Sequence, residues 1–366
     1  MPEKATRYLS RVTTLPLTQP PASVCILRLA TLGDVCHILP MVRTLQAEWP
    51  NTQFTWVTGT SAARLIDRLP DIECLTFDDA APLSALRDLK QRLHGRRFDL
   101  LLHLDPRALA NAIAFRVQAT IKLGFDLARA RRFQWLFTTH RIEPAKRQHV
   151  LDGMFGFAER LGVREKVLRW DIPLDDAARD FAQALIPDGM PTVVISPSAP
   201  QRTRIWRAEY YAQAADFVAT AYGMRVVLCG GRGVHDKRLG EHIAAHMRQP
   251  CMNAIGQDTL PGLLAALERA ALLLTPDSDV AHLATAVGTP VLGLYAATNS
   301  LRNGPYLSRQ LCIDKYDAAA RALLGRPASS VRWTTTIDRE GVMDLITPDD
   351  VIKKLQSFMA QRSKRR

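Results

Sequence analysis

The sequence predicts an α/β protein built from two doubly wound parallel sheets. Short, β-branched apolar runs alternate with longer amphipathic stretches, and this alternation stops once, near 172–191, before it resumes. The chain has 366 residues, 47% of them hydrophobic, which is enough to fill two cores of ordinary size. We therefore expect two similar halves that face each other across a cleft, with ligands at the carboxyl ends of their strands.

The first half follows a loose leader, 1–22, which carries charges and prolines and does not read as a secretory signal. Its expected strands are Ser23–Leu29, Phe54–Thr58, Cys74–Phe77 and Asp99–Leu104. Its expected helices lie near Val35–Glu48, Ser61–Leu69, Leu83–His94 and Ala108–Gln118. Gly124 is expected to begin either a loop or a further strand. We assign 23–172 to this domain.

A linker, 173–190, separates the halves, because Pro173, Pro187 and Gly189 surround a single helical run. The second domain is expected over 191–346, and 347–366 forms a helix with a basic tail. Its expected strands are Thr192–Ser196, Arg225–Cys229, Met252–Ala254, Ala271–Leu274 and Val291–Tyr295. Its expected helices are Ala208–Tyr222, Lys237–Met247, Leu260–Glu268, Val280–Val287 and Pro348–Ala360, the last with Thr347 as a possible N-cap.

Composition excludes several classes of protein. No run of about 18 apolar residues exists, so we expect a cytoplasmic protein without a membrane-spanning helix. The six cysteines lack CxxC or metal-site spacing and are expected to be buried free thiols. The net charge is +12, and the segment 105–149 holds nine Lys or Arg against three acids. Such a segment is either an ordinary solvated face or a binding site for nucleic acid, an anionic membrane or an acidic substrate. Nucleic acid is disfavoured, because the sequence has no nucleic-acid-binding motif.

The stretch 275–295 carries the strongest ligand signal. A buried strand leads into Asp277, Ser278 and Asp279, a helix follows, and Gly288-Thr289-Pro290 separates that helix from the next strand. A helix N-terminus favours a phosphate or diphosphate. An ordinary capped connection remains the alternative, and a second site has to decide between them.

A second motif spans 26–40, where a strand, a turn with Thr31 and Gly33, and a helix follow one another. Asp34 opens the helix and is either a general base at the cleft edge or a capping acid. His37 lies one turn later and either lines the cleft or packs internally.

Three loops of the second half complete the candidate site. The loop 196–206 carries Ser198, Arg202 and Arg204, which suit a diphosphate. Gly230 and Gly231 end a strand and let backbone approach a ligand. The stretch Gly256–Leu260, with Gln257, Asp258, Thr259 and Leu260, precedes a helix and either borders a base or ribose or only caps that helix.

These motifs resemble glycosyltransferase family 9, the ADP-heptose:lipopolysaccharide heptosyltransferases of the GT-B fold. The likeness is carried by Leu32–Val35 with Pro40, and by Asp277–His282 with the Leu-Ala-Thr-Ala-Val-Gly-Thr-Pro that follows. The chain departs from the family at Asp279, where glycine is common, and at Ala199 and Pro200, where threonines are often found.

The resemblance implies inverting transfer of heptose from ADP-heptose, a co-substrate, to Kdo on lipid A, with Asp34 as base and without metal or other cofactor. It places Asp277, Ser278, His282 and Arg204 on the donor, and Asp279, in the same turn, is a further candidate donor contact. An acidic glycolipid acceptor implies a protein bound peripherally to the inner face of the cytoplasmic membrane in a Gram-negative bacterium. Candidate acceptor contacts besides Thr31, Gly33 and His37 are Arg107, Arg116, Lys122, Arg129, Arg131 and Arg132. The alternatives are another nucleotide-sugar transferase or epimerase of this fold, and a non-catalytic nucleotide-binding relative.

Overall fold

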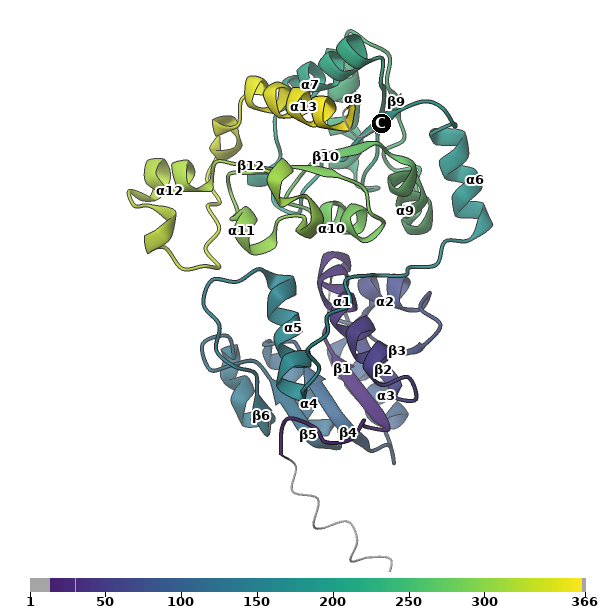
Figure 1. Cartoon of the computed structure of the whole chain (residues 1–366), viewed down its shortest axis with the longest axis vertical. Helices are drawn as coiled ribbons and strands as arrows, with labels where there is room; N and C mark the ends of the chain where they lie inside the picture. The colour runs from purple at the N-terminus through teal and green to yellow at the C-terminus, as the bar shows by residue number, and fades with distance from the viewer. Residues whose placement is uncertain (1–13, 30, 364–366) are drawn as a thin grey trace, which may run out of the picture. The chain divides into compact units, whose positions relative to one another are not determined.

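The computed structural model describes residues 14–29 and 31–363, so most of the expected leader and the last three residues of the basic tail lie outside it. The chain divides into two compact units. Unit 1 contains Ile38–Lys146, Asp152–Arg169 and the described residues before Leu32. Unit 2 contains Leu32–His37, Arg147–Leu151 and the described residues from Trp170 onward. Each unit holds a six-stranded parallel sheet with helices, which confirms the predicted fold class (Figure 1).

The sheet of unit 1 has the order β3-β2-β1-β4-β5-β6, which reverses direction at β1. Its strands are β1 (Ser23–Leu27), β2 (Gln53–Gly59), β3 (Ile72–Phe77), β4 (Phe98–His103), β5 (Ala119–Gly124) and β6 (His140–Arg141). Its helices are α2 (Thr60–Ile66), α3 (Pro82–Arg92), α4 (Ala108–Arg116) and the short η2 (Arg131–Phe137). The helix α1 (Leu32–Glu48) has its first turn in unit 2, and α5 (Val150–Leu161) begins there as well.

Right-handed crossovers explain how the helices of unit 1 are distributed. From β1 to β3 each new strand is added on one side of the previous strand, and from β3 to β5 on the opposite side. The helices that connect β1 to β3 therefore cover one face of the sheet, and those that connect β3 to β5 cover the other. One buried cluster shows this directly, because α3 and α4 share it with strands β1 to β4. Its members include Ala85, Leu89, Ala110, Ile113, Leu27, Val57, Leu75 and Leu101. Apolar β-branched and leucine-rich strands are therefore covered on both faces.

Unit 2 repeats this plan, with the strand order β12-β11-β10-β7-β8-β9. Its strands are β7 (Thr192–Ile195), β8 (Arg225–Leu228), β9 (Met252–Asn253), β10 (Leu272–Pro276), β11 (Val291–Tyr295) and β12 (Ile313–Asp314). Its helices are α6 (Asp176–Leu185), α7 (Ala208–Tyr222), α8 (Val234–His246), α9 (Leu260–Arg269), α10 (Asp279–Ala286), α11 (Ser300–Asn303), α12 (Tyr316–Leu324) and α13 (Pro348–Ser363). Its 3-10 turns are η3 (Arg202–Arg204), η4 (Tyr306–Leu311), η5 (Ala328–Ser330) and η6 (Val342–Leu345).

In unit 2, α7, α8 and α13 lie on one side of the sheet and α9 and α10 on the other (Figure 1). Trp206 is fully buried in the core beside α7, and its indole N–H donates to the carbonyl of Ile346 at 2.8 Å. Thr347 caps α13, because its hydroxyl accepts the backbone N–H of Asp350 at 3.2 Å. The chain after η6 is thereby fastened to the core, and Trp206 fixes the end of the loop that carries Arg204.

Several local predictions need correction. Gly124 ends β5, a strand that was not predicted, and a loop follows it, which was one of the two expected alternatives. The helix expected from Lys237 begins at Val234, and the last helix continues to Ser363. All six cysteines are free, but Cys74, Cys251 and Cys312 are only partly buried. Among the described residues, none of the helices is long and apolar enough to cross a membrane.

Candidate active site

The carboxyl ends of β7 and β10 form the centre of the candidate site in unit 2. These two strands are hydrogen-bonded neighbours at the point where strand order reverses, with Ile195 opposite Leu274. Loops that leave such a point in opposite directions open a crevice that binds ligands in doubly wound sheets. Ser196 follows β7, and Asp277 follows β10.

Asp277 is held by two side chains, one from η3 and one from α11. Its carboxylate accepts a hydrogen bond from Arg204 Nη1 at 3.1 Å and from Asn303 Nδ2 at 2.7 Å. Asp277 is 5% exposed, and the Arg204 side chain in this ion pair is also largely buried. The Arg204 Nε–H has no hydrogen-bond partner among the described residues. A buried, fixed cation with an unused donor suits a diphosphate oxygen.

The N-terminus of α10 lies directly after Asp277. Ser278 is its N-cap residue, but its hydroxyl does not cap the helix. Instead Ser278 Oγ contacts Thr275 Oγ1 at 3.0 Å. Asp279 is the acid of the first turn, a position that the helix dipole favours.

The first turn of α1 belongs to the same compact unit and packs against α10. A Cβ atom on Gly33 would come within 2.5 Å of Asp279 Oδ1 and 2.9 Å of His282 Cδ2. Only glycine permits this approach without a shift of both side chains. Asp34 follows in this turn and is half-buried.

Three histidines extend the site. The His282 and His37 rings are 4.2 Å apart between centroids, and the His37 and His149 rings are 5.6 Å apart. Burial lowers the pKa of His282, against the opposing charges of Asp277, Asp279 and Asp34, so its imidazole is neutral near pH 7. His149 is also neutral in this geometry, because Nδ1 accepts the Leu151 N–H at 3.1 Å and Nε2 donates to the Gly304 carbonyl at 2.8 Å.

A second group of buried polar atoms lies beside β7, β8 and β9. The hydroxyls of Ser196 and Ser198 and the carboxylate Oδ2 of Asp258 have no hydrogen-bond partner within the described part of the chain. Gly230 is next to Ser198, since a Cβ on this glycine would be 3.7 Å from Ser198 Oγ. Burial raises the pKa of Asp258 to about 6, with Arg232 opposing the shift. Unpartnered buried polar groups are costly and often indicate a ligand site.

The sequence indicates Asp258 only as one residue of the stretch Gly256–Leu260 and does not single it out as a contact. Asp258 lies between the proposed contacts Gln257 and Thr259, yet nothing in its sequence neighbourhood shows that it is buried while Gln257 is exposed. Only its position in the chain could have indicated a role, because Asp258 follows β9, the edge strand next to β8.

The remaining donor candidates have mainly local partners. Arg202 contacts His235 Nε2 at 3.0 Å, and Gln257 donates to the Asn253 carbonyl at 3.2 Å. Thr259 is the N-cap of α9, as the alternative reading expected, and Leu260 begins that helix. A Cβ on Gly231 would come within 2.5 Å of Asp236 Oδ2, so this glycine serves the close turn into α8.

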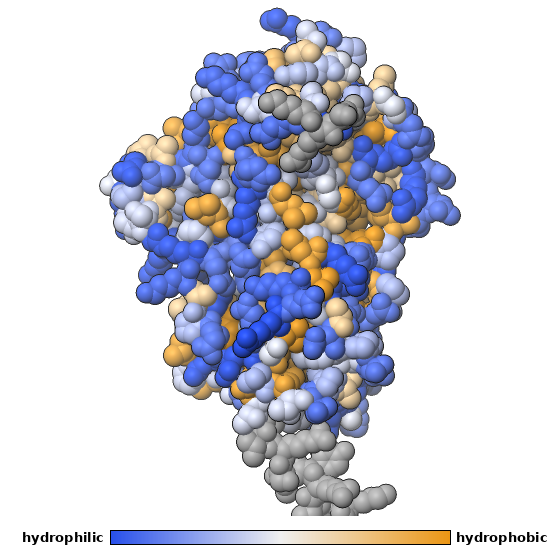
Figure 2. All heavy atoms as spheres, in the orientation of Figure 1, coloured by the Kyte–Doolittle hydropathy of each residue, from blue (hydrophilic) through white to orange (hydrophobic). Residues whose placement is uncertain are grey.

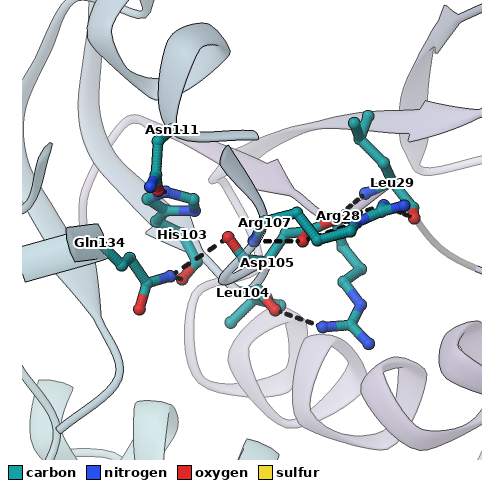
Figure 3. A network of polar contacts seen from close by, with 8 residues as sticks. All are labelled: Arg28, Leu29, His103, Leu104, Asp105, Arg107, Asn111 and Gln134. Carbon is teal, nitrogen blue, oxygen red and sulfur yellow. Dashed lines mark hydrogen bonds and ion pairs between the residues drawn. The ribbon is translucent and has the colours of Figure 1, made fainter. Parts of the chain in front are cut away.

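At the corresponding position of unit 1, the ends of β1 and β4 carry a polar network (Figure 3). Asp105 is 1% exposed, forms an ion pair with Arg107 and accepts the Leu29 N–H at 3.0 Å. Arg28 donates to the Leu104 carbonyl at 2.7 Å. Burial on its own would raise the pKa of Asp105, but Arg107 and Arg28 outweigh it, so the pKa lies below its ordinary value.

The network continues through His103, Asn111 and Gln134 (Figure 3). His103 Nε2 donates to Asn111 Oδ1 at 2.9 Å, and Gln134 Nε2 donates to the His103 carbonyl at the same distance. Burial lowers the pKa of His103 to about 4, against the opposing effect of the Asn111 hydrogen bond. The imidazole is therefore neutral near pH 7.

The basic acceptor candidates of unit 1 differ in their contacts and in their exposure. Arg107, Arg129, Arg116 and Lys122 have intramolecular partners: Asp105, Asp126, and the carbonyls of Ala112 and Ala114. Arg131 and Arg132 are exposed, as is Thr31. Arg107 and Arg116 are exposed as well, so the accessible positive charge of unit 1 is not confined to the start of η2.

The described residues contain no group of three or more histidine, cysteine, aspartate or glutamate side chains placed to hold a metal ion.

Comparison with known proteins decides the family. The model of glycosyltransferase family 9 (heptosyltransferase) matches residues 86–328. The chain is also 33% identical over 341 residues to the lipopolysaccharide core heptosyltransferase OpsX of Haemophilus influenzae, covering 93% of this chain and 98% of that protein. The chain belongs to glycosyltransferase family 9. Escherichia coli K12 lipopolysaccharide heptosyltransferase 1 is a more distant relative, 24% identical over 79% of this chain and 92% of its own length.

Solved structures of this glycosyltransferase family have the same fold. The family 9 glycosyltransferase of Veillonella parvula matches with a TM-score of 0.76 and 21% identity, over 93% of this chain and 97% of that chain. The E. coli heptosyltransferase WaaC, solved with ADP, matches with a TM-score of 0.65 and 21% identity, over 80% and 92%. The two parallel sheets are thus those of the GT-B fold, as the resemblance implied, and the protein is a glycosyltransferase.

Proposed function

We propose that this glycosyltransferase transfers heptose from ADP-heptose to Kdo on lipid A during synthesis of the lipopolysaccharide inner core, with inversion at the anomeric carbon. The observation that carries the proposal is the end-to-end similarity to OpsX, a lipopolysaccharide core heptosyltransferase. The geometry supports it, because unit 2 joins a diphosphate-suited cation, a helix N-terminus and an aspartate-bearing turn in one compact unit.

The donor is proposed to lie over the ends of β7, β8 and β10. Arg204 and the N-terminus of α10 face the diphosphate and stabilise the charge that develops as ADP leaves. Asp277 supports this role by holding Arg204 in place at 3.1 Å. Ser198, Gly230 and Asp258 lie on the nucleoside side, where their buried polar atoms gain partners from ribose or base.

Asp34 is proposed as the general base. The acceptor hydroxyl oxygen attacks the anomeric carbon, the bond from that carbon to the diphosphate oxygen breaks, and Asp34 takes the hydroxyl proton. Gly33 supports this role because it brings the Asp34 turn within contact of Asp279 and His282. His282, uncharged near pH 7, is proposed as a neutral donor near the sugar or the diphosphate.

The acceptor is proposed to contact the basic side of unit 1. An acidic saccharide complements the excess of arginine and lysine between 105 and 149, of which Arg131 and Arg132 are exposed. A lipid-bound acceptor requires the enzyme to work at the inner face of the cytoplasmic membrane as a peripheral protein. No metal takes part in the proposed steps.

The test is to incubate the protein with Kdo-lipid A and a panel of nucleotide sugars while measuring nucleoside diphosphate release. We expect rapid ADP release with ADP-heptose, little turnover with other donors, and no loss of rate in EDTA. The product glycosidic bond, examined by NMR, is expected to have the anomeric configuration opposite to that of the donor. Faster turnover with another donor would replace the sugar assignment, and retained configuration would overturn the single displacement. Nucleotide binding without turnover on any acceptor would favour the non-catalytic alternative.

A further inference from the structure

We propose that η2 of unit 1 is a membrane-insertion segment that places Phe133, Trp135 and Leu136 into a bilayer of anionic lipids. The inference adds a lipid-binding element to the proposed function. It rests on the proposed function in one respect, namely that an enzyme with a lipid-bound acceptor has to reach a membrane. The evidence is the exposure, the backbone and the charge of this segment.

The segment displays three large apolar side chains within four residues. Phe133 is 68% exposed, Trp135 is 43% exposed and Leu136 is 62% exposed. Single exposed apolar residues are ordinary, but a contiguous group of this size indicates a binding surface. Apolar residues reach the surface of the molecule as patches among polar ones (Figure 2).

The backbone of the segment is held in an unfavourable conformation that produces this display. Arg132 has φ 53° and ψ 37°, and Phe133 has φ 59° and ψ 29°, so two successive residues with Cβ atoms are left-handed. Such strain persists only where the surroundings enforce it, and it concentrates at functional sites.

The buried side-chain amides of Asn111 and Gln134 hold the backbone of η2 in this conformation (Figure 3). Asn111 Nδ2 donates to the Arg132 carbonyl at 2.8 Å, inside the strained pair. Gln134 is fully buried and donates to the His103 carbonyl at 2.9 Å, while its Oε1 accepts the Phe125 N–H at 3.3 Å. Phe137, one 3-10 turn after Gln134, packs against the core of unit 1. Gln134 and Phe137 thus face inward and leave Phe133, Trp135 and Leu136 outside.

The charge of the segment selects an anionic bilayer as the partner. Between Leu127 and Ile142 the sequence has four arginines and no aspartate or glutamate. Arg131 and Arg132 are exposed directly beside the apolar side chains. Arginines next to tryptophan, phenylalanine and leucine match the boundary between anionic headgroups and acyl chains, where the aromatic rings insert and the guanidinium groups stay at the headgroups.

The test is flotation of the full chain with vesicles rich in phosphatidylglycerol and with vesicles of phosphatidylcholine alone. The triple variant Phe133→Ser, Trp135→Ser, Leu136→Ser is compared with a control triple variant, Leu83→Ser, Leu168→Ser, Met190→Ser, which removes apolar side chains that are 76%, 41% and 53% exposed elsewhere. We expect the wild-type chain and the control to float with the anionic vesicles. The η2 triple variant should lose at least about tenfold in partitioning, because inserted aromatic and aliphatic side chains supply most of the binding.

Trp135 provides a second readout that does not depend on the triple variant. Quenching of tryptophan fluorescence by brominated lipids should be strong in the wild-type chain and much weaker in Trp135→Phe. Of the other five tryptophans, Trp49, Trp56, Trp170 and Trp206 are buried, and Trp333 is half-buried with its indole N–H bonded to the Gln148 carbonyl at 2.9 Å. The inference would be overturned by equal flotation of the wild type and the η2 triple variant, or by equal quenching of the wild type and Trp135→Phe. It would also be overturned if the wild-type chain were a dimer that the η2 substitutions dissociate. Intact transferase activity with no vesicle binding defeats this inference alone, whereas vesicle binding without transferase activity defeats only the proposed function.

Discussion

Asp105 in unit 1 and Asp258 in unit 2 are both buried aspartates that follow strands of a doubly wound sheet, yet their surroundings shift their pKa values in opposite directions. Asp105 has an arginine partner and a backbone N–H donor, and its pKa is lowered despite burial. One carboxylate oxygen of Asp258 has no partner among the described residues, and its pKa rises to about 6. The difference separates a carboxylate that stabilises the fold from one that remains available to a ligand.

The same contrast extends to the groups around each aspartate. In unit 1, Asn111 and Gln134 connect strand ends to η2 with hydrogen bonds that are already made, although His103 Nδ1 is buried without a partner among the described residues. In unit 2, Ser196, Ser198 and the Arg204 Nε–H are buried and lack partners within the described chain. These unpaired polar groups raise the free energy of unit 2 in the absence of ligand. A nucleotide that bonds to them would lower this free energy, which would favour binding.

The largest effect is expected for Asp105→Asn. Removing this charge leaves Arg107 beside a neutral amide and weakens the bond from the Leu29 N–H. The free energy of unfolding should fall by about 2–3 kcal/mol, because buried charge-assisted hydrogen bonds are lost while the half-exposed Arg107 remains solvated. The measurement is the denaturant midpoint at pH 7. A midpoint equal to that of the wild type would show that the unit 1 network does not stabilise the fold.

Arg204→Gln should next weaken ADP binding by about 10- to 100-fold, because a charge-assisted bond to the diphosphate is lost. Calorimetric titration with ADP measures this effect. The matched control is Arg207→Gln, in the same loop, whose ion pair with Asp344 is largely exposed. Similar affinities for both variants would remove Arg204 from the donor site.

Asp258→Asn should stabilise the free protein at pH 8, which is opposite to the effect at Asp105. The pKa of Asp258 is about 6 when folded and near 3.8 when unfolded, so the folded state binds the proton more tightly and stability is lost as pH rises from about 4 to above 6. The amide removes this cost, roughly 1–3 kcal/mol at pH 8 and close to zero at pH 4. Thermal unfolding of both proteins across this pH range is the measurement, and a difference that does not change with pH would contradict the assignment.

The smallest effect is expected for Ser198→Ala. Because its hydroxyl has no partner among the described residues, unfolding stability should change by less than about 1 kcal/mol, while ADP affinity falls by a factor of about 3–10. Thr58→Val is the control, since the Thr58 hydroxyl of unit 1 is also buried without a partner in the described chain. Thr58→Val should leave ADP affinity unchanged, and an equal loss in both variants would refute the nucleoside-side role of Ser198.

The sequence was sufficient to predict the fold class, because long strands and amphipathic helices have strong periodicity. It did not predict β6 and β12, each two residues long, or α5, whose apolar pattern is interrupted by Gly153 and Gly156. Such elements form only because neighbouring strands and helices are already in place.

The candidate site shows the same limit. Asp277 and Arg204 were both expected at the donor, from local motifs, and they form an ion pair. Gln134 was not expected, and Asp258 was not distinguished from its neighbours, because their importance depends on burial and on contacts from distant parts of the chain. The exposed apolar side chains of η2 and its left-handed backbone were not predicted either, since no local residue pattern requires left-handed backbone at Arg132 and Phe133.

The most direct test of the central proposal compares ADP binding and ADP release in Asp34→Asn, with Asp279→Asn as the matched neighbouring acid. With ADP-heptose and Kdo-lipid A, Asp34→Asn should lose at least about a hundredfold in turnover while binding ADP as the wild type does, because a general base acts on the acceptor proton and not on the nucleotide. Asp279→Asn should retain much more of the rate. Wild-type turnover in Asp34→Asn would contradict the assignment of Asp34 as the catalytic base.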